Sequence, residues 1–252
     1  MTVHAYAGRP DPMREARIDL AAAFRLAARL GFDDTIWNHF TLAVPGRNDR
    51  FFSKPHGLLM SEIRASDIIV IDEAGNTVEG QGKSDRAAVC IHVGVHQTHP
   101  RARCVLHTHQ KYATWLGNIE GGRLLPVNQN AIRFYNRVSY DEGYNGLGTS
   151  REEGARIARC LGETNNILVL GNHGMIVVGP TVGHAFYDLY YFEVSCEEQY
   201  MIACSGQAPR LIPQDICQMT YEQYQTDEAD AGIDYFAAMK RMLAREEPDF
   251  ME

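Results

Sequence analysis

Apolar residues recur every four positions near the start of the chain, which predicts an amphipathic helix over residues 11–30. The apolar stripe consists of Ile18, Ala22, Leu26 and Leu30. Asp11 is a suitable N-cap, Pro12 is tolerated in the first helical turn, and Gly31 suits the end of the helix. We therefore expect a helix that packs one face against a core.

Short apolar runs separated by turn residues follow and predict a series of strands. The runs cover residues 37–44, 51–54, 68–72 and 77–80. Three or four strands in succession with short turns favour an antiparallel meander over βαβ units.

The second half of the chain mixes helical and strand patterns. Helices are expected over residues 84–98, 112–116, 150–160, 181–205 and 221–245, with Ser84, Ser150 and Thr181 as N-caps. Strands are expected over residues 104–109, 166–170 and 175–178, with strand-like pieces within 124–140. The pattern predicts one α/β domain over residues 1–252 with a mainly antiparallel sheet.

The composition narrows the class of protein. The chain has 252 residues, of which 45% are hydrophobic and 22% charged, enough to bury a sizeable core. A net charge of −8 argues against nucleic acid as a partner, and no apolar run is long enough for a membrane span. No secretory signal pattern is evident, and six scattered cysteines without a CxxC pair indicate free thiols in a reducing compartment, hence a cytoplasmic protein.

Three histidines carry the candidate chemistry. His107 and His109 end an apolar strand pattern, and side chains two positions apart on a strand share one face. A buried pair of imidazoles needs a partner. His173 lies in a glycine-flanked turn between two apolar runs. Three neutral imidazoles with an open fourth position are typical of a catalytic Zn²⁺ or another divalent transition metal.

Five short motifs occur in order along the chain: Gly31, Asn38, Pro55-His56-Gly57, His107-Thr108-His109 and Asn172-His173-Gly174. This order resembles the class II aldolase/adducin family over residues 13–205. The resemblance implies a three-layer α/β/α sandwich, a small-molecule substrate and a homotetramer. It also implies that His107, His109 and His173 hold a divalent metal, foremost Zn²⁺, with Mn²⁺, Co²⁺ and Fe²⁺ as alternatives.

The resemblance assigns further residues to the site. Asn38 matches an asparagine that contacts the substrate, and His56-Gly57 matches a turn that binds a substrate phosphate through backbone N–H groups. Gln129 or Asn130 stands where fuculose aldolase has a catalytic tyrosine, and two candidate substitutes, Tyr135 and Tyr140, are nearby. Each residue also has a plainer interpretation. Asn38 could be an ordinary residue of an edge strand, His56 an ordinary turn residue, and Tyr135 a side chain that only packs.

The acid/base carboxylate of the family is the main departure. The position 19 residues before His107 is Ala88. Asp85, one helical turn earlier, is a candidate catalytic substitute, although a first-turn acid that serves the helix dipole is the alternative. Ser84 and Arg86 stand at or beside the family's phosphate-binding serines. Arg86 could bind a carboxylate or phosphate, or it could be a solvated surface side chain.

Without that carboxylate, a step that relies on the metal is favoured. Decarboxylation of a 3-oxo acid and retro-aldol cleavage are two such steps. We therefore expect a metal-dependent lyase that acts on a small oxygenated carbonyl compound. A non-catalytic, adducin-like interaction module and an iron-dependent oxygenase on the same three histidines are the alternatives. The substrate, and whether it is phosphorylated, stay open.

Overall fold

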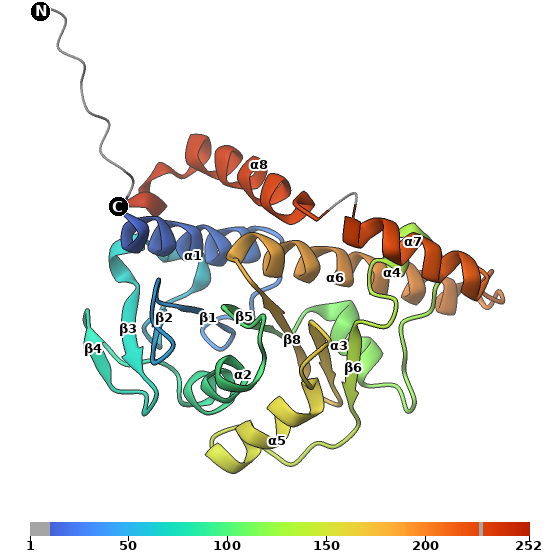
Figure 1. The fold of residues 1–252 in the computed structure, drawn as a ribbon, viewed down its shortest axis with the longest axis horizontal. Coiled ribbons are helices and arrows are strands. Elements are labelled where there is room, and N and C mark those ends of the chain that lie inside the picture. The colour runs from blue at the N-terminus through green and yellow to red at the C-terminus, as the bar shows by residue number, and fades with distance from the viewer. Residues whose placement is uncertain (1–10, 227–228) are drawn as a thin grey trace, which may run out of the picture.

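One sheet of eight strands runs through the protein, and the computed structural model describes residues 11–226 and 229–252 (Figure 1). The strand order is β4-β3-β2-β1-β5-β8-β7-β6. The strands are β1 (His39–Ala43), β2 (Arg50–Ser53), β3 (Ile69–Asp72), β4 (Thr77–Glu79), β5 (Cys104–Thr108), β6 (Val138–Asp141), β7 (Ile167–Leu170) and β8 (Gly174–Gly179). Every neighbouring pair is antiparallel except β6 and β7. The predicted α/β fold with a mainly antiparallel sheet is confirmed, including the meander from β1 to β4.

Helices cover both faces of this sheet (Figure 1). The α-helices in the described residues are α1 (Pro12–Arg29), α2 (Val93–Thr98), α3 (Lys111–Gly117), α4 (Gln129–Ile132), α5 (Arg151–Leu161), α6 (Val182–Ser205), α7 (Gln214–Thr226) and α8 (Ala231–Glu246). Apolar residues of α1, α3, α6 and α8 pack on one face, and those of α2 and α5 pack on the other. None of these helices combines the length and apolar composition needed to cross a bilayer.

The central strands read as unbroken apolar runs because both of their faces are buried. In β8, Met175 and Val177 pack with α1 and α6, whereas Ile176 and Val178 pack with α2 and α5. Burial on both sides removes the alternation of apolar and polar residues that marks a half-exposed strand.

Most predicted helix starts are confirmed by their caps. The side chain of Asp11 accepts a hydrogen bond from the backbone N–H of Met13 at 3.0 Å. Ser150 and Thr181 accept the corresponding bonds at the starts of α5 and α6. The predicted Ser84 cap is wrong, because Asp85 accepts hydrogen bonds from the first turn instead. That helix continues through a π-helical segment, Ala88–His92, into α2.

Two other sequence-based boundaries are wrong. The helix expected over residues 221–245 is two helices, α7 and α8, and residues 227–228 between them lie outside the described part. Asp230 directly precedes α8, and aspartate is a weak helix former. Within 124–140, only β6 is a strand, and the short helix α4 precedes it with Asn128 as its cap.

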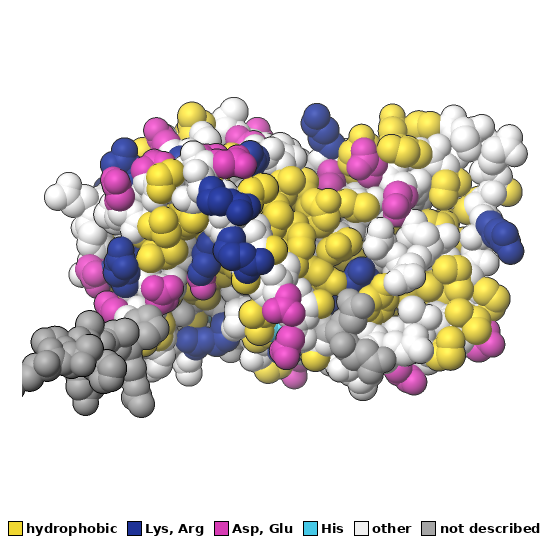
Figure 2. All heavy atoms as spheres, turned by 90° about the horizontal axis from the view of Figure 1, so that it is seen from above, with side chains coloured by type: hydrophobic (Ala, Val, Ile, Leu, Met, Phe, Trp, Pro, Cys, Tyr) yellow, Lys and Arg dark blue, Asp and Glu magenta, His cyan; other side chains and the backbone are white. Residues whose placement is uncertain are grey.

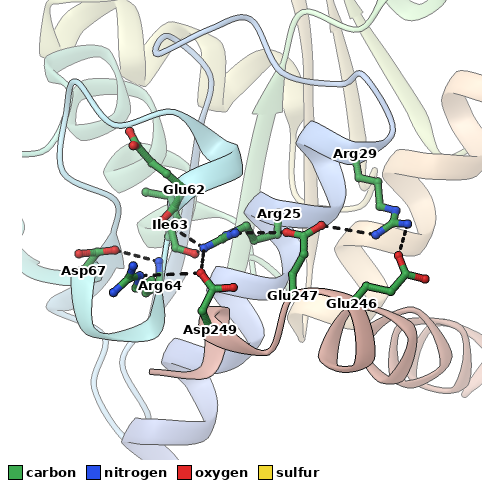
Figure 3. A network of polar contacts seen from close by, with 9 residues as sticks. All are labelled: Arg25, Arg29, Glu62, Ile63, Arg64, Asp67, Glu246, Glu247 and Asp249. Carbon is green, nitrogen blue, oxygen red and sulfur yellow. Dashed lines mark hydrogen bonds and ion pairs between the residues drawn. The ribbon is translucent and has the colours of Figure 1, made fainter.

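A buried arginine joins the first helix to the end of the chain (Figure 3). Arg25 on α1 donates to the carbonyl oxygen of Ile63 at 2.8 Å and to the carboxylate of Asp249 at 2.7 Å. It also pairs with Glu247 at 3.2 Å. Asp249 belongs to a final 3-10 helix, Pro248–Met251, so these bonds fasten segments that are far apart in the sequence.

Candidate metal centre

The three candidate ligands meet where β5 and β8 lie side by side. His107 is in β5, and His109 follows its end. His173 is in the turn between β7 and β8, and β8 pairs with β5 so that Thr108 lies opposite Met175. The ligand atoms of the three histidines lie within 4.8 Å of one another. The pairing of the strands therefore brings together residues that are 66 positions apart (107 to 173).

The Asn172-His173-Gly174 turn is shaped for this close approach. Asn172 has a φ of +57°, a left-handed conformation that asparagine tolerates better than most residues. A Cβ at position 174 would lie 2.4 Å from the carbonyl oxygen of Thr108 and 2.9 Å from Cδ2 of His109. Glycine is therefore required for the turn to place His173 beside His109.

Hydrogen bonds fix which ring nitrogens face the centre. Nδ1 of His107 donates to the carbonyl oxygen of Met175 at 2.9 Å, and Nδ1 of His109 donates to Asp34 Oδ2 at 2.8 Å. These acceptors have no proton to give, so in the neutral rings Nε2 carries the lone pair. Such bonds to the second nitrogen are the usual way in which proteins orient histidine ligands.

The distance between the two Nε2 atoms is informative. They are 3.1 Å apart, although two lone pairs on neutral rings would repel each other. Two nitrogens on one tetrahedral ion, with bonds of 2.0–2.1 Å, should be separated by about 3.3 Å. The donor set therefore fits a shared metal ion.

Burial keeps His107 and His173 unprotonated. It lowers the pKa of His107 well below the usual value for histidine. It also lowers the pKa of His173 to about 4, with a smaller contribution from the neighbouring His109. Neutral imidazole is the form that binds a metal, so both rings are ready to do so at neutral pH.

Asn38 has the properties expected of a ligand-binding residue. Its side chain is fully buried, and neither Oδ1 nor Nδ2 has a hydrogen-bond partner within residues 11–226 and 229–252. A buried amide without partners is unfavourable unless a bound molecule satisfies it. The next residue, His39, lies directly opposite His107 in the pairing of β1 with β5.

Asp85, His56 and Gly57 are brought together beside the centre. Asp85 Oδ1 accepts from the backbone N–H of Ala87 at 2.7 Å, and Oδ2 lies 3.1 Å from Nδ1 of His56. Gly57 has a φ of +97°, which suits the turn that holds His56. Burial lowers the pKa of His39 to about 3, and the nearby charge of Asp85 partly opposes this effect. The carboxylate is therefore near the site, but both of its oxygens are already engaged.

Ser84 and Arg86 make contacts of another kind. Ser84 Oγ bonds to Ser53 Oγ at 2.7 Å, and Arg86 donates to the carbonyl oxygen of Thr149 at 2.9 Å. Both side chains line an open hollow together with Lys83. Their role in binding a substrate stays a prediction.

Gln129 and Tyr135 lie near α4, away from this cluster. Gln129 is the first residue of α4, is exposed, and accepts from the hydroxyl of Tyr224 through its carbonyl at 3.3 Å. The short helix packs against α6 and α7. Across the described part of the chain, no contact joins Gln129 or Tyr135 to the three histidines, and their roles stay predictions.

Two charged residues near the centre, Asp34 and Lys54, stand in no recognisable sequence motif. Asp34 orients His109 but sits in an irregular segment before β1. Lys54 is buried, and its Nζ donates to the carbonyl oxygens of Ile36 and Leu58, each at 2.9 Å. Burial lowers the pKa of Lys54, and Asp85 opposes that effect. Both residues reach the site through tertiary contacts, which no local pattern predicts.

Two features together define the class of protein. One is a mainly antiparallel sheet with helices on both faces, and the other is the convergence of three histidines beside its central strands. Residues 18–200 match the family model described as the class II aldolase and adducin N-terminal domain. The chain therefore belongs to the class II aldolase and adducin family, as its motifs predict.

Relatives in this family differ in their described roles. Decarboxylase NovR of Streptomyces niveus is 31% identical over 205 residues, covering 81% of this chain and 75% of that protein. Alpha-adducin of Rattus norvegicus is 32% identical over 196 residues, covering 77% of this chain but 26% of that protein. The crystal structure of an aldolase II superfamily protein from Pseudomonas syringae has a TM-score of 0.89 and 31% identity, covering 98% of each chain.

Proposed function

We propose that this protein is a metal-dependent lyase that breaks a carbon–carbon bond next to a carbonyl group in a small oxygenated substrate. The observation that carries the proposal is the convergence of His107, His109 and His173 within 4.8 Å. Outward hydrogen bonds on two of these rings leave Nε2 for the metal. The lyase class is supported by the family and by the decarboxylase relative.

The three histidines would hold the metal, with Zn²⁺ as the first candidate and Mn²⁺, Co²⁺ or Fe²⁺ as alternatives. A bound divalent metal draws electron density from a carbonyl oxygen and stabilises the negative charge that develops there as the bond breaks. Asn38 would bind a polar group of the substrate through its unpaired amide. The ammonium group of Lys54 would favour a negatively charged substrate nearby.

Decarboxylation and retro-aldol cleavage both suit this arrangement. Ala88, at the position of the family's carboxylate, is buried and has no group that exchanges a proton. Asp85 is the nearest candidate, and its engagement in the helix cap makes it less available. A reaction that needs little proton transfer from a carboxylate is therefore favoured, and decarboxylation of a 3-oxo acid is the simplest.

The first experiment measures metal content and reaction together. Protein purified without a nickel column should contain about one divalent metal per chain by mass spectrometry, and His109→Ala should contain almost none while keeping its circular dichroism spectrum. The loaded protein should release carbon dioxide from a 3-oxo acid or an aldehyde from a β-hydroxy carbonyl compound. Protein that neither contains nor takes up metal would contradict the proposal and favour an interaction module. Oxygen consumption with Fe²⁺ would favour the oxygenase.

We also propose a homotetramer in the cytoplasm, with the three-layer sandwich of the family as its fold. Apolar side chains gather on the surface formed by the long helices, as Figure 2 shows. Exposed members on α6, α7 and α8 are Tyr200, Met201, Ile216, Met219 and Ile233. Such a patch supports self-association, and six free cysteines support a reducing compartment. Light scattering coupled to gel filtration gives the number of copies, and a monomer would contradict the tetramer.

A further inference from the structure

A line of buried polar side chains leads away from the candidate metal centre. Nδ1 of His39 lies 3.0 Å from Nε2 of His92, whose Nδ1 lies 2.8 Å from Oγ1 of Thr41. The same hydroxyl lies 2.8 Å from Nε2 of His96, and Nδ1 of His96 lies 2.5 Å from the carbonyl oxygen of Ala102. His39, His92 and Thr41 are all at least 96% buried, since their exposed fractions are 4%, 0% and 1%.

The last member of this line sets the direction of every bond before it. A carbonyl oxygen only accepts, so Nδ1 of His96 must carry a hydrogen. Burial lowers the pKa of His96 to about 4, so the ring is neutral and its Nε2 is an acceptor. The hydroxyl of Thr41 therefore donates to His96, which leaves its oxygen to accept from Nδ1 of His92.

The same reasoning continues to His39. Burial also lowers the pKa of His92 well below the usual value, so this ring is neutral and its Nε2 accepts. Nδ1 of His39 is then the donor in the bond to His92. A neutral His39 with its hydrogen on Nδ1 has a bare lone pair on Nε2.

The bare nitrogen belongs to a ring at the edge of the metal centre. The ring centroids of His39 and His107 are 4.8 Å apart, and Asp85, His109, Lys54 and His173 are all close enough to influence the pKa of His39. Among the described residues, the His39 ring makes one hydrogen bond, from Nδ1 to His92, and its Nε2 makes none. His39 is not among the residues that share the metal position.

We propose that His39 binds a hydroxyl group of the substrate, with Nε2 as the acceptor, and that His92, Thr41 and His96 are positioning residues that hold His39 in this tautomer. The inference rests on the proposed function, because it takes the substrate to lie beside the three histidines. It names the substrate class more closely, as a carbonyl compound with a free hydroxyl group. A group that can only accept favours a hydroxyl over a carboxylate or a second carbonyl at that point.

The tautomers can be observed directly, with or without metal. Long-range proton–nitrogen correlation spectra of protein with ¹⁵N-labelled histidine distinguish a ring with hydrogen on Nδ1 from one with hydrogen on Nε2. We expect His39, His92 and His96 in the Nδ1–H form. Thr41→Val removes the central hydroxyl with little change of shape and should abolish the single-tautomer pattern of His92 and His39. Thr114→Val, which removes a buried hydroxyl without a partner, is the matched control.

Binding tests the selectivity for a hydroxyl. Hydroxypyruvate and pyruvate differ only in that group, and calorimetry with zinc-loaded protein should give about tenfold tighter binding of hydroxypyruvate. His39→Phe should bring the ratio of affinities close to one with unchanged zinc content, and Thr41→Val should reduce the ratio.

The outcomes separate this inference from the proposed function. An Nε2–H form of His39 would overturn the inference. Equal affinities of wild-type protein for hydroxypyruvate and pyruvate would also overturn it, and so would a failure to bind either acid measurably. A preference that persists in both His39→Phe and Thr41→Val would overturn it too. Loss of zinc binding in wild-type protein would count against the proposed metal site, while the metal-free spectra would still decide the tautomer of His39. If His39→Phe does not fold, Thr41→Val provides the same test.

Discussion

At the scale of single residues, the bond between Asp34 and His109 is the outermost part of the candidate metal centre. A carboxylate that accepts from the second ring nitrogen fixes the ring's orientation and increases the basicity of the nitrogen that faces the metal. Asp34 is half exposed, so its effect acts through this one directed bond and not through a buried charge.

Replacing this carboxylate should weaken the metal site without removing it. Asp34→Asn keeps the size of the side chain but removes its charge, and we expect zinc affinity to fall about 10–100-fold. Competition with a chromophoric chelator measures the change. Asp33→Asn removes a neighbouring exposed carboxylate and serves as the control. Equal affinities of the two variants would show that Asp34 does not support His109.

Single residues also show how far a local pattern reaches. The i, i+2 spacing of His107 and His109 was sufficient to predict a shared face, because that geometry lies within one strand. The partners Asp34, Lys54 and His39 depend on how β1 pairs with β5 and how the preceding loop folds over it. Asn38 was predicted only through the resemblance to a family, since its special feature, a buried amide without partners, exists only in the folded chain.

At the scale of elements, the turn from β7 to β8 determines whether the third histidine reaches the other two. The turn is closed by a left-handed Asn172 and by a glycine whose missing side chain leaves room for β5. The site therefore depends on strand pairing and on one tight turn.

A methyl group at Gly174 should disturb the centre directly. Gly174→Ala would place a Cβ 2.4 Å from the carbonyl oxygen of Thr108, so β5 or the turn must move. We expect a loss of about 1–3 kcal/mol in the free energy of unfolding and weaker zinc binding. At Gly143, the nearest atom to an added Cβ is Oδ1 of Asp141 at 3.5 Å. Gly143→Ala should therefore change neither the free energy of unfolding nor the zinc affinity much. Urea unfolding and zinc titration measure the two effects, and unchanged zinc affinity in Gly174→Ala would contradict this role for the turn.

Elements were predictable where their signals are local. Caps at Asp11, Ser150 and Thr181 and the buried runs of β5, β7 and β8 give strong patterns, and these elements were found within two residues of their observed bounds. The C-terminal helices were merged because residues 227–230 between them include neither proline nor glycine, the strongest breaking signals. Ser84 and Asp85 are adjacent and both are good caps, so only the observed hydrogen bonds distinguish them.

At the scale of the whole molecule, Arg25 connects the first helix to the last turn of chain (Figure 3). Arg25→Met should retain the packing of the aliphatic stem but lose the bonds to Ile63, Glu247 and Asp249. We expect the free energy of unfolding to fall by about 1–3 kcal/mol, because the carbonyl of Ile63 loses its buried donor. Arg29→Met removes more exposed ion pairs to Glu246 and Glu247 and should change stability by less than about 1 kcal/mol. Denaturant unfolding compares the free energies of unfolding of the two variants. Equal decreases in Arg25→Met and Arg29→Met would contradict a special role for the buried arginine.

Stability should depend on pH through the buried histidines. Burial holds the pKa of His39 at about 3 and that of His92 well below its usual value, so the folded protein keeps both rings neutral. Unfolded histidine binds a proton below about pH 6.5. The free energy of unfolding is therefore unaffected by these two histidines above about pH 6.5. As the pH falls from there towards the pKa values of the folded protein, it decreases by about 1.4 kcal/mol per pH unit for each histidine.

The measurement is urea unfolding of metal-free protein between pH 7 and pH 5. His92→Gln removes one such group, so its stability should change less steeply with pH than that of the wild type, whatever its stability at pH 7. Parallel slopes for the two proteins would show that His92 is not kept neutral by the fold.

The convergence of residues 107, 109 and 173 also has a thermodynamic consequence for the whole chain. The three ligand positions come together only when β5 and β8 are paired, so a metal should bind the folded protein much better than the unfolded one. Free metal at 100 times its dissociation constant would then raise the stability by about 2.7 kcal/mol. The melting temperature should rise with the logarithm of the free zinc concentration. It should keep rising at concentrations where the folded protein is already fully occupied. The lifetime of the protein against heat and proteases would thereby follow the supply of trace metal in its surroundings.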